Sequence, residues 1–146
     1  MNSKKRILGM LAVAALALST LACGGIREAA AQQKTSNDIK QLSIGYHTYA
    51  SEKSKPPANA PEFTAWSTTG DPDATAAYLR LLAAGYKVYW GTDLQKLPAG
   101  TGNTVLVYHA DAPTKGGMVG MADGSVRTMT ADEFGMAAKP TPPAPK

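Results

Sequence analysis

Two histidines and several aspartates are the residues of this sequence best suited to hold a metal ion. His47 and His109 are the only histidines, and Asp111 and Asp123 follow the second one. Imidazole and carboxylate groups together suit zinc or iron. However, no H-x-x-x-H or H-E-x-x-H spacing places two imidazoles on one helix face. We therefore expect no metal and no other cofactor, and we interpret His47 as a packed or surface residue of a helix.

Catalytic chemistry has little support in the sequence. Ser125 lies in G-S-V without the G-x-S-x-G pattern of a hydrolase nucleophile, and we interpret it as the first residue after a turn. The four clustered carboxylates each have a role in a turn or helix cap: Asp111, Asp123, Asp132 and Glu133. A calcium ion held by Asp111, Asp123 and loop carbonyls stays open as an alternative, although no D-x-D-x-D-G loop is present. We predict that the protein is not an enzyme.

The single cysteine follows an apolar N-terminal segment. The first six residues, MNSKKR, carry three positive charges, and the apolar run 7–22 follows them. This arrangement is typical of a secretory signal. A transmembrane helix needs about 20 apolar residues, so this run is short for that role. A single cysteine also excludes a disulfide framework and a zinc site built from cysteines.

The residues around this cysteine resemble the lipobox of bacterial lipoproteins. Residues 19–23 read S-T-L-A-C, with Thr20 where an apolar residue is usual. The resemblance implies that the leader 1–22 is removed and that Cys23 carries lipid. Lipid chains of this kind would anchor the protein stably to a membrane, on its extracytoplasmic side, in the inner or the outer membrane. The alternative is ordinary secretion, with cleavage after the A-A-A run 29–31.

Composition and charge limit the remaining chain to one modest domain. The chain has 146 residues, and we expect a tether at 23–32 and a Pro-rich disordered tail at 139–146. About 110 residues remain, at 33–138, which suffices for a single core. The formal charge of +4 includes three leader residues, without which 12 basic residues face 11 acidic ones. A nucleic-acid partner is therefore not expected.

Two helices are predicted in the first half of this domain. From about Gln33 to Lys53 the apolar residues are spaced as on one helix face: Ile39, Leu42, Tyr46 and Tyr49. The polar side of this helix would include Lys34, Asp38, Lys40, Ser43 and Glu52. Residues 54–70 contain three prolines, and we expect an irregular segment pinned to the core by Phe63 and Trp66.

The second helix is predicted from its end signals. Asp71 can cap it, Pro72 suits its first turn, and Gly85 is a natural end. Its core face would carry Tyr78, Leu81 and Leu82.

The second half of the domain has the pattern of an antiparallel meander. Strand-like runs occur at 86–90, 104–108, 118–122 and 125–129. Asp123-Gly124 predicts a two-residue hairpin in which both residues have positive φ. Residues 130–133 form a capping box for a last helical turn near Gly135. Tyr86, Tyr89 and Trp90 could stack on a ligand, but core packing explains them better. The predicted fold class is α+β.

Two segments are similar to prepilin-like bacterial proteins. The N-D-I-K-Q-L run at 37–42, Y-H-T-Y at 46–49 and the prolines at 56–57 are similar to the N-L-K-Q-x-x-L-A-x-H-x-Y…P-P stretch of that family. The family ends in an H-x9-D-G signature, which these residues resemble: His109, Gly116, Gly117, Asp123, Gly124, Ser125 and Val126. In this chain thirteen residues, instead of nine, separate the histidine from the aspartate.

This resemblance implies a pseudopilin-like head, in which an N-terminal helix packs on a small antiparallel sheet. The long apolar helix of pilins is missing after Cys23, so filament assembly is not expected. We interpret the protein as a non-enzymatic, lipid-anchored envelope protein that acts in assembly or binds a protein partner. The alternative is a small ligand- or ion-binding lipoprotein that uses the loops at 91–103 and 109–117. A third possibility, an envelope hydrolase, lacks a catalytic constellation.

Overall fold

A computed structural model describes the backbone of residues 3–141 and the side chains of residues 25–141. Internal contacts divide the chain into Met1–Lys34 and Thr35–Lys146. The first part contains only helix among its described residues, and the second contains every other element; we call residues 35–141 the head. The side chains of the predicted leader, that of Cys23 and the tail residues 142–146 lie outside the described residues.

Helix α1 (Ser3–Lys53) is continuous through the segment predicted as a tether. The prediction that the helix begins near Gln33 is wrong, because residues 24–33 are already helical. Alanine, glutamate, glutamine and arginine dominate residues 27–33, and these are strong helix formers that outweigh the preceding Gly-Gly pair. Residues 25–34 are exposed, so this part of the helix is polar and solvated.

The predicted apolar stripe of α1 is confirmed as the centre of the head. Its four residues expose at most 2% of their surface: Ile39, Leu42, Tyr46 and Tyr49. Helices α1 and α3 (Pro72–Ala83) come close together at Gly45, where an added Cβ would lie 2.4 Å from the Cβ of Ala74. Only glycine fits there, so this position fixes how closely the two helices pack.

Two residues assigned to the polar side of this helix are buried, which corrects the prediction. Asp38 is 7% exposed and accepts hydrogen bonds from Arg80 of α3, at 2.6 Å from Nη2 and 3.0 Å from Nε. Ser43 has no exposed surface, and its hydroxyl donates to the carbonyl of Ile39 at 2.9 Å. The sequence pattern of α1 gave no sign that α3 reaches Asp38 or that the hairpin at Gly124 lies next to Ser43.

Residues 60–70 form a helix, α2 (Ala60–Gly70), and not the irregular segment predicted there. Asn59 caps it by accepting from the Glu62 N–H at 2.9 Å. Pro61 lies in the first turn, where the missing N–H costs nothing. The buried Phe63 and the partly buried Trp66 pack on the core as expected, and this packing overrides the weak helix propensity of the serines and threonines.

The second predicted helix is confirmed as α3. The Asp71 side chain accepts from the Ala74 N–H at 3.1 Å, Pro72 opens the helix, and Gly85 follows its end with φ of 87°. Tyr78 and Leu81 are buried, but Leu82 is 52% exposed, so its assignment to the core face is wrong. At 100° per residue, Leu82 is turned past the face that meets the sheet.

The sheet is an antiparallel meander of four strands, which confirms the predicted α+β fold. Its order is β1 (Tyr86–Val88), β2 (Val105–His109), β3 (Gly117–Met121) and β4 (Val126–Met129). The register aligns Lys87 with Tyr108, Tyr108 with Val119, and Val119 with Arg127. Two short helices flank β2, namely η1 (Thr101–Asn103) and α4 (Ala112–Lys115). The sequence did not indicate either of them.

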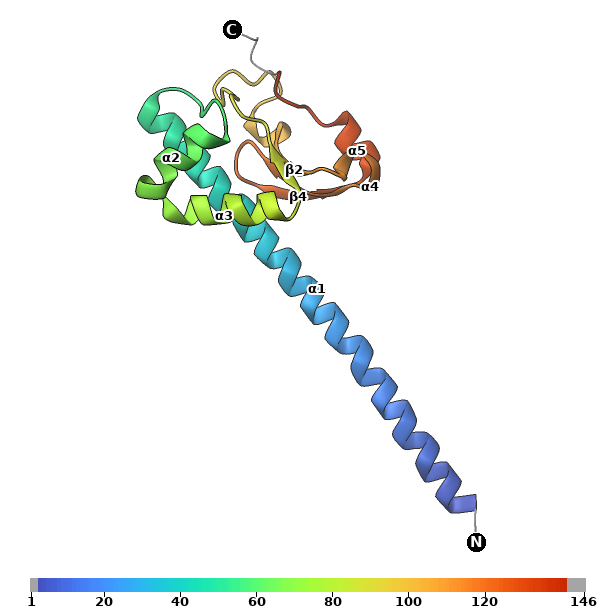
Figure 1. The fold of residues 1–146 in the computed structure, drawn as a ribbon. Coiled ribbons are helices and arrows are strands. Elements are labelled where there is room, and N and C mark those ends of the chain that lie inside the picture. The colour runs from blue at the N-terminus through green and yellow to red at the C-terminus, as the bar shows by residue number, and fades with distance from the viewer. Residues whose placement is uncertain (1–2, 142–146) are drawn as a thin grey trace. The chain divides into compact units, whose positions relative to one another are not determined.

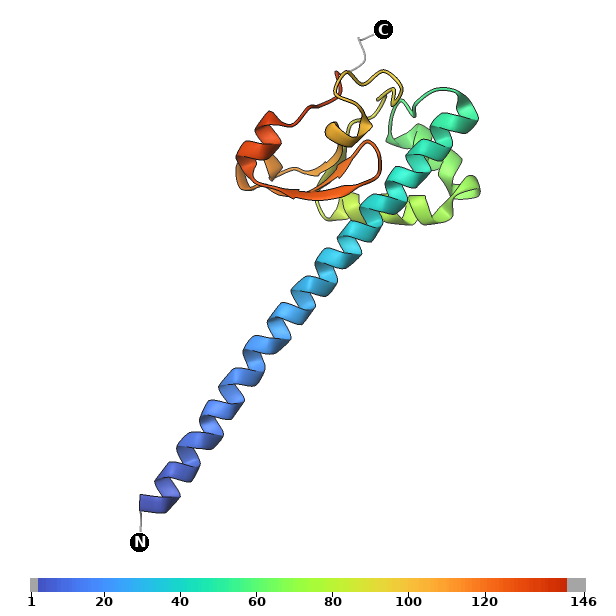
Figure 2. The ribbon, with the colours of Figure 1, turned by 180° about the vertical axis from the view of Figure 1, so that it is seen from behind.

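Two groups of helices cover the two faces of this sheet. Residues of α1, α2 and α3 share one core with Leu106 and Val107, whereas Ala112 of α4 and Phe134 of α5 (Ala131–Met136) share a second core with Val119. Both views show α2 and α3 to one side of the strands and α4 and α5 to the other (Figures 1 and 2). The predicted capping box of α5 is confirmed, with Thr130 and Glu133 bonded reciprocally.

The first two residues assigned to the disordered tail belong to the head. The Lys139 ammonium donates to the carbonyl of Phe134 at 2.5 Å and lies 4.6 Å from the centre of its ring. Pro140 is buried. A lysine at the end of a helix interacts favourably with its last carbonyls, which explains why the ordered chain continues past residue 138.

Candidate functional site

The residues of the prepilin-like signature fall at two opposite ends of the sheet. His109 ends β2, and Gly116 and Gly117 precede and begin β3, so these three share one end. Residues 123–126 lie at the hairpin between β3 and β4, at the other end. Antiparallel strands of this length hold the two groups apart. The signature therefore does not form a single site in this head.

The hairpin lies where the sequence predicts it, but its turn is of a different type. Gly124 has φ of 85°, whereas Asp123 does not have positive φ. The Gly124 N–H donates to the Met121 carbonyl at 3.0 Å, and the Met121 N–H donates to the Ser125 carbonyl at 2.8 Å. This pattern is a three-residue loop that ends in a left-handed glycine, because Asp123 keeps a conformation that suits its side chain better.

Asp123 has a role within this turn. Its carboxylate accepts from the Ser125 N–H at 2.9 Å. Hydrogen bonding from Ser125 holds the pKa of Asp123 below its ordinary value. Such an aspartate stabilises the turn, as the sequence analysis expected.

The metal sites considered from the sequence are not assembled. His47 donates from Nε2 to the Ala122 carbonyl at 2.7 Å, next to the hairpin. His109 lies at the other end of the sheet, where its Nδ1 accepts from the Asp111 N–H at 3.1 Å. Asp111 pairs with Lys115 at 2.8 Å, and this hydrogen bond lowers its pKa. Neither the two histidines nor the calcium pair Asp111 and Asp123 come together. Over the described side chains, no three histidine, cysteine, aspartate or glutamate residues form a metal-binding group.

The aromatic residues after α3 pack into the core. The ring of Trp90 lies 5.5 Å from that of Phe63 and 6.1 Å from that of Tyr46, measured between centroids. The Tyr46 hydroxyl donates to the Thr92 carbonyl at 3.1 Å and accepts from the Thr92 N–H at 2.9 Å. Burial raises the pKa of Tyr46 to about 12. These rings therefore support the loop that follows β1.

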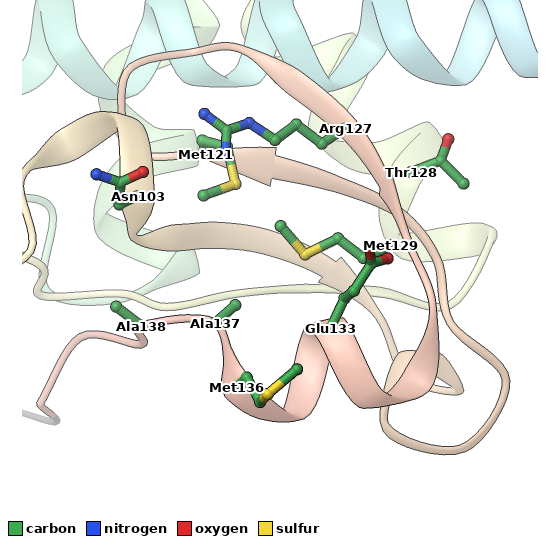
Figure 3. A pocket seen from close by; sticks show the side chains of 9 residues that line it. All are labelled: Asn103, Met121, Arg127, Thr128, Met129, Glu133, Met136, Ala137 and Ala138. Atoms are coloured by element: carbon green, nitrogen blue, oxygen red, sulfur yellow. The ribbon is translucent and has the colours of Figure 1, made fainter.

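An open groove lies between β4, α5 and the chain that follows α5 (Figure 3). Its volume is about 480 Å³, and we call it the methionine groove because three methionines line it. The other lining residues are Asn103, Arg127, Thr128, Glu133, Ala137 and Ala138. Met121 is buried at 1% exposure, Met129 is partly buried, and Met136 is 80% exposed. The groove thus has a buried apolar floor and an exposed apolar rim.

Polar residues at the methionine groove are held in place by their own hydrogen bonds. Figure 3 shows Arg127 extending toward Met121, while Thr128 points the opposite way. The Arg127 guanidinium donates to the Gly102 carbonyl at 2.8 Å. The Glu133 carboxylate accepts from the Thr130 N–H at 2.8 Å. These groups frame the groove, and Met136 at its rim is the methionine that remains strongly exposed.

A second hollow, of about 740 Å³, lies beside the end of α1. We call it the polar hollow, and its lining comes from three segments of the chain. Residues of α1 and the following turn contribute His47, Ala50, Ser51, Ser54, Lys55 and Pro56; the loop after β1 contributes Asp93, Leu94, Gln95 and Lys96; and η1 contributes Thr101. This hollow includes part of the 91–103 loop that the sequence analysis associated with ligand binding.

Neither hollow was located by the sequence analysis. The three methionines are spread over 16 positions of the sequence, and the lining of the polar hollow combines residues near 50 with residues near 95. Only the fold brings them together.

The chain matches no family model, no curated protein and no solved structure. No described helix is long and apolar enough to cross a membrane.

Proposed function

We propose that this chain is a lipid-anchored cell-envelope protein whose pseudopilin-like head binds an apolar segment of another envelope protein. The observation that carries the proposal is the methionine groove. Methionine is flexible and polarizable, and it is common on surfaces that adapt to partner side chains. Met136 is 80% exposed at the rim of this groove, where an apolar partner segment would cover it.

Anchoring through Cys23 is the second part of the proposal. The lipobox-like residues 19–23 support it, together with the charged and apolar leader before them. The polar, exposed residues 25–34 would lie between the anchor and the head. With such an anchor, the head would lie outside the cytoplasm and near a membrane surface.

The proposal includes neither catalysis nor filament formation. The carboxylates considered for catalysis take part in turns, caps and ion pairs, as described for Asp111, Asp123 and Glu133. The apolar stripe of α1 is covered by its own head, so this stripe is not free to pack against other copies as a pilin helix does. We expect purified protein to sediment as a monomer or a small oligomer.

Fractionation of cells tests the anchor. Cys23→Ala should move the protein from the membrane to the soluble fraction and abolish the incorporation of labelled fatty acid. The wild-type chain, expressed in parallel, should be labelled and should remain with the membrane. A wild-type protein that takes up no label and begins at Gln32 would contradict lipidation and indicate ordinary secretion.

Site-specific photocrosslinking tests the methionine groove. A crosslinking amino acid at Met136 should give a discrete adduct in intact cells. The matched control is the same amino acid at Thr69, which is also exposed and lies on α2, far along the chain from the groove. Equal adducts at both positions, or none at Met136, would argue against a partner in this groove.

A further inference from the structure

We propose that the polar hollow binds a small, oxygen-rich anion, such as a sugar that carries a carboxylate or a phosphate. This site is separate from the methionine groove, and the inference does not depend on a protein partner. A volume of about 740 Å³ is within the range of small-molecule sites. Its chemistry follows from the kinds of side chain that line it.

Hydrogen-bond donors dominate the lining. Hydroxyl groups come from Ser51, Ser54 and Thr101, an amide from Gln95, and ammonium groups from Lys55 and Lys96. Hydroxyl and amide groups match the hydroxyls of a sugar, and ammonium groups form charge-assisted hydrogen bonds with oxyanions. Leucine and proline are the only large apolar residues, so an apolar ligand would leave many of these polar groups unpaired.

Each lysine of the lining already pairs with one carboxylate, so an anion would be bound by the N–H groups that the two ammonium groups have left. Asp93 is the one acidic residue among the lining residues, and its carboxylate already pairs with Lys96 at 3.0 Å and accepts from the Gln95 N–H at 3.1 Å. These hydrogen bonds lower the pKa of Asp93, and the bond from Lys96 has the largest effect. Lys55 pairs with Glu62 at 2.6 Å, but its side chain remains 59% exposed and has further N–H groups to donate.

Backbone strain at the wall of the hollow is an independent observation. Ser54 follows the last residue of α1 and has φ of 53°; no other described residue except glycine has positive φ. Glycine or asparagine usually occupies this position, because other side chains are strained there. A strained residue at a site often reflects a functional constraint. The serine retains a hydroxyl among the lining residues of the hollow, which a glycine would not.

Titration of the full-length, detergent-solubilised protein with three probes tests the proposal. Glucuronate supplies a carboxylate, glucose 6-phosphate supplies a phosphate, and glucose has the same hydroxyl-rich ring without charge. Calorimetry should show saturable binding of at least one anion at millimolar concentrations and much weaker binding of glucose. Binding of one anion alone identifies the preferred oxyanion. Glucose binding as strong as that of both anions, or no saturable binding of any probe, would overturn the proposal.

Two variants assign the binding to this hollow. Lys96→Gln removes one ammonium group and the ion pair of Asp93, so anion affinity should fall by about tenfold or more. Lys87→Gln is the matched control, because Lys87 is an exposed lysine on β1 that does not line the hollow. Anion binding that is unchanged in Lys96→Gln, or reduced equally in both variants, would contradict this location.

Ser54→Gly separates binding from folding. Relief of the left-handed strain should raise the melting temperature of the protein. Loss of the hydroxyl should at the same time weaken anion binding several-fold. Weaker binding in a more stable protein cannot result from unfolding, so this combination supports the proposal. A variant that binds the anion as tightly as the wild type would show that Ser54 is not part of the site.

Discussion

The sheet face that meets α1 is packed with aromatic rings, whereas the face that meets α5 carries methionines and stays partly open. On the first face the ring of Phe63 lies 5.5 Å from that of Trp90, 6.0 Å from that of Trp66 and 6.3 Å from that of Tyr78. Interlocked rings of this kind restrict one another to a single arrangement. This face therefore determines the shape of the head.

The second face is smaller and less constrained. Phe134 is the one buried aromatic residue of this core, and its ring lies 5.4 Å from that of Tyr108. Tyr108 in turn stacks on Tyr89 at 4.9 Å, but both tyrosines and Met129 are only partly buried. Unbranched methionine side chains can change rotamer at low cost. One sheet thus has a more rigid face that stabilises the fold and a more adaptable face, which is the one we propose for contact with a partner.

Removing one phenylalanine from each face should give the largest effects and the clearest comparison. Phe63→Ala should lower the free energy of unfolding by about 5 kcal/mol, because the surrounding rings cannot collapse into the cavity. Phe134→Ala should lower it by about 3 kcal/mol, because neighbouring methionines can move into the space. Urea unfolding of both variants measures the difference. An equal or larger loss for Phe134→Ala would show that the two faces are equally rigid.

Gly124→Val tests the hairpin that carries residues of both faces. The left-handed φ of 85° is strained for a β-branched residue, so the free energy of unfolding should fall by about 1–3 kcal/mol. Gly135→Val is the control: Gly135 has no positive φ, and an added Cβ would have open space. That control should change stability by only a few tenths of a kcal/mol. Similar stability of the two variants would contradict the turn geometry.

Acid should weaken the corner between α1 and α2. The Glu62 carboxylate accepts from Lys55 at 2.6 Å, from the Tyr49 hydroxyl at 2.5 Å and from the Ala58 N–H at 2.9 Å. These hydrogen bonds lower the pKa of Glu62 from 4.5 to about 2, and the bond from Lys55 has the largest effect. Because folding lowers this pKa, the ionised Glu62 carboxylate stabilises the folded state. This stabilisation is fully present above pH 4.5 and is lost as the pH falls through 2.

A stability profile between pH 7 and pH 2 measures this contribution. Glu62→Gln should reduce stability at neutral pH and flatten the acid limb of the profile. The control Glu133→Gln changes a carboxyl group on the other side of the sheet, for which no such set of three donors exists. Identical acid limbs in Glu62→Gln and the wild type would show that this corner does not titrate as described.

Changes at the rim of the methionine groove should have the smallest effect on stability. Met136 is 80% exposed, so Met136→Ser should alter the free energy of unfolding by no more than about 0.5 kcal/mol. The same change should reduce the yield of photocrosslinking from a probe at Ala137, because it removes apolar surface from the groove. A large loss of stability would mean that this rim supports the fold instead of a partner.

The sequence predicted those parts of the fold that depend on neighbouring residues. The cap of α3 by Asp71, the capping box at Thr130 and the stripe of α1 each depend on residues within a few positions of one another. Helix α2 was missed because its serines, threonines and nearby prolines disfavour helix locally, and the burial of Phe63 decides the outcome. Helix α1 began earlier than expected for the opposite reason, since its polar residues are strong helix formers.

The candidate sites could not be predicted in the same way. The methionine groove needs the register that places β4 beside β3, and the polar hollow needs the loop after β1 to return to the end of α1. The positive φ of Ser54 leaves no mark in the sequence, since serine itself does not indicate it. Conversely, the prepilin-like signature reads as one motif in the sequence but is divided between two ends of the sheet.

Ala138, which follows α5, closes the start of the central strand β2, and this has a consequence for the order in which the head can fold. The Val105 N–H, at the start of β2, donates to the Ala138 carbonyl at 2.9 Å, and Thr104 forms a parallel bridge with the same residue. Ribosomes add about 5–20 residues per second from the N-terminus, so Ala138 emerges after all four strands of the sheet. A nascent chain that already contains the four strands therefore still lacks this contact, and β2 gains it only when the segment after α5 has been made.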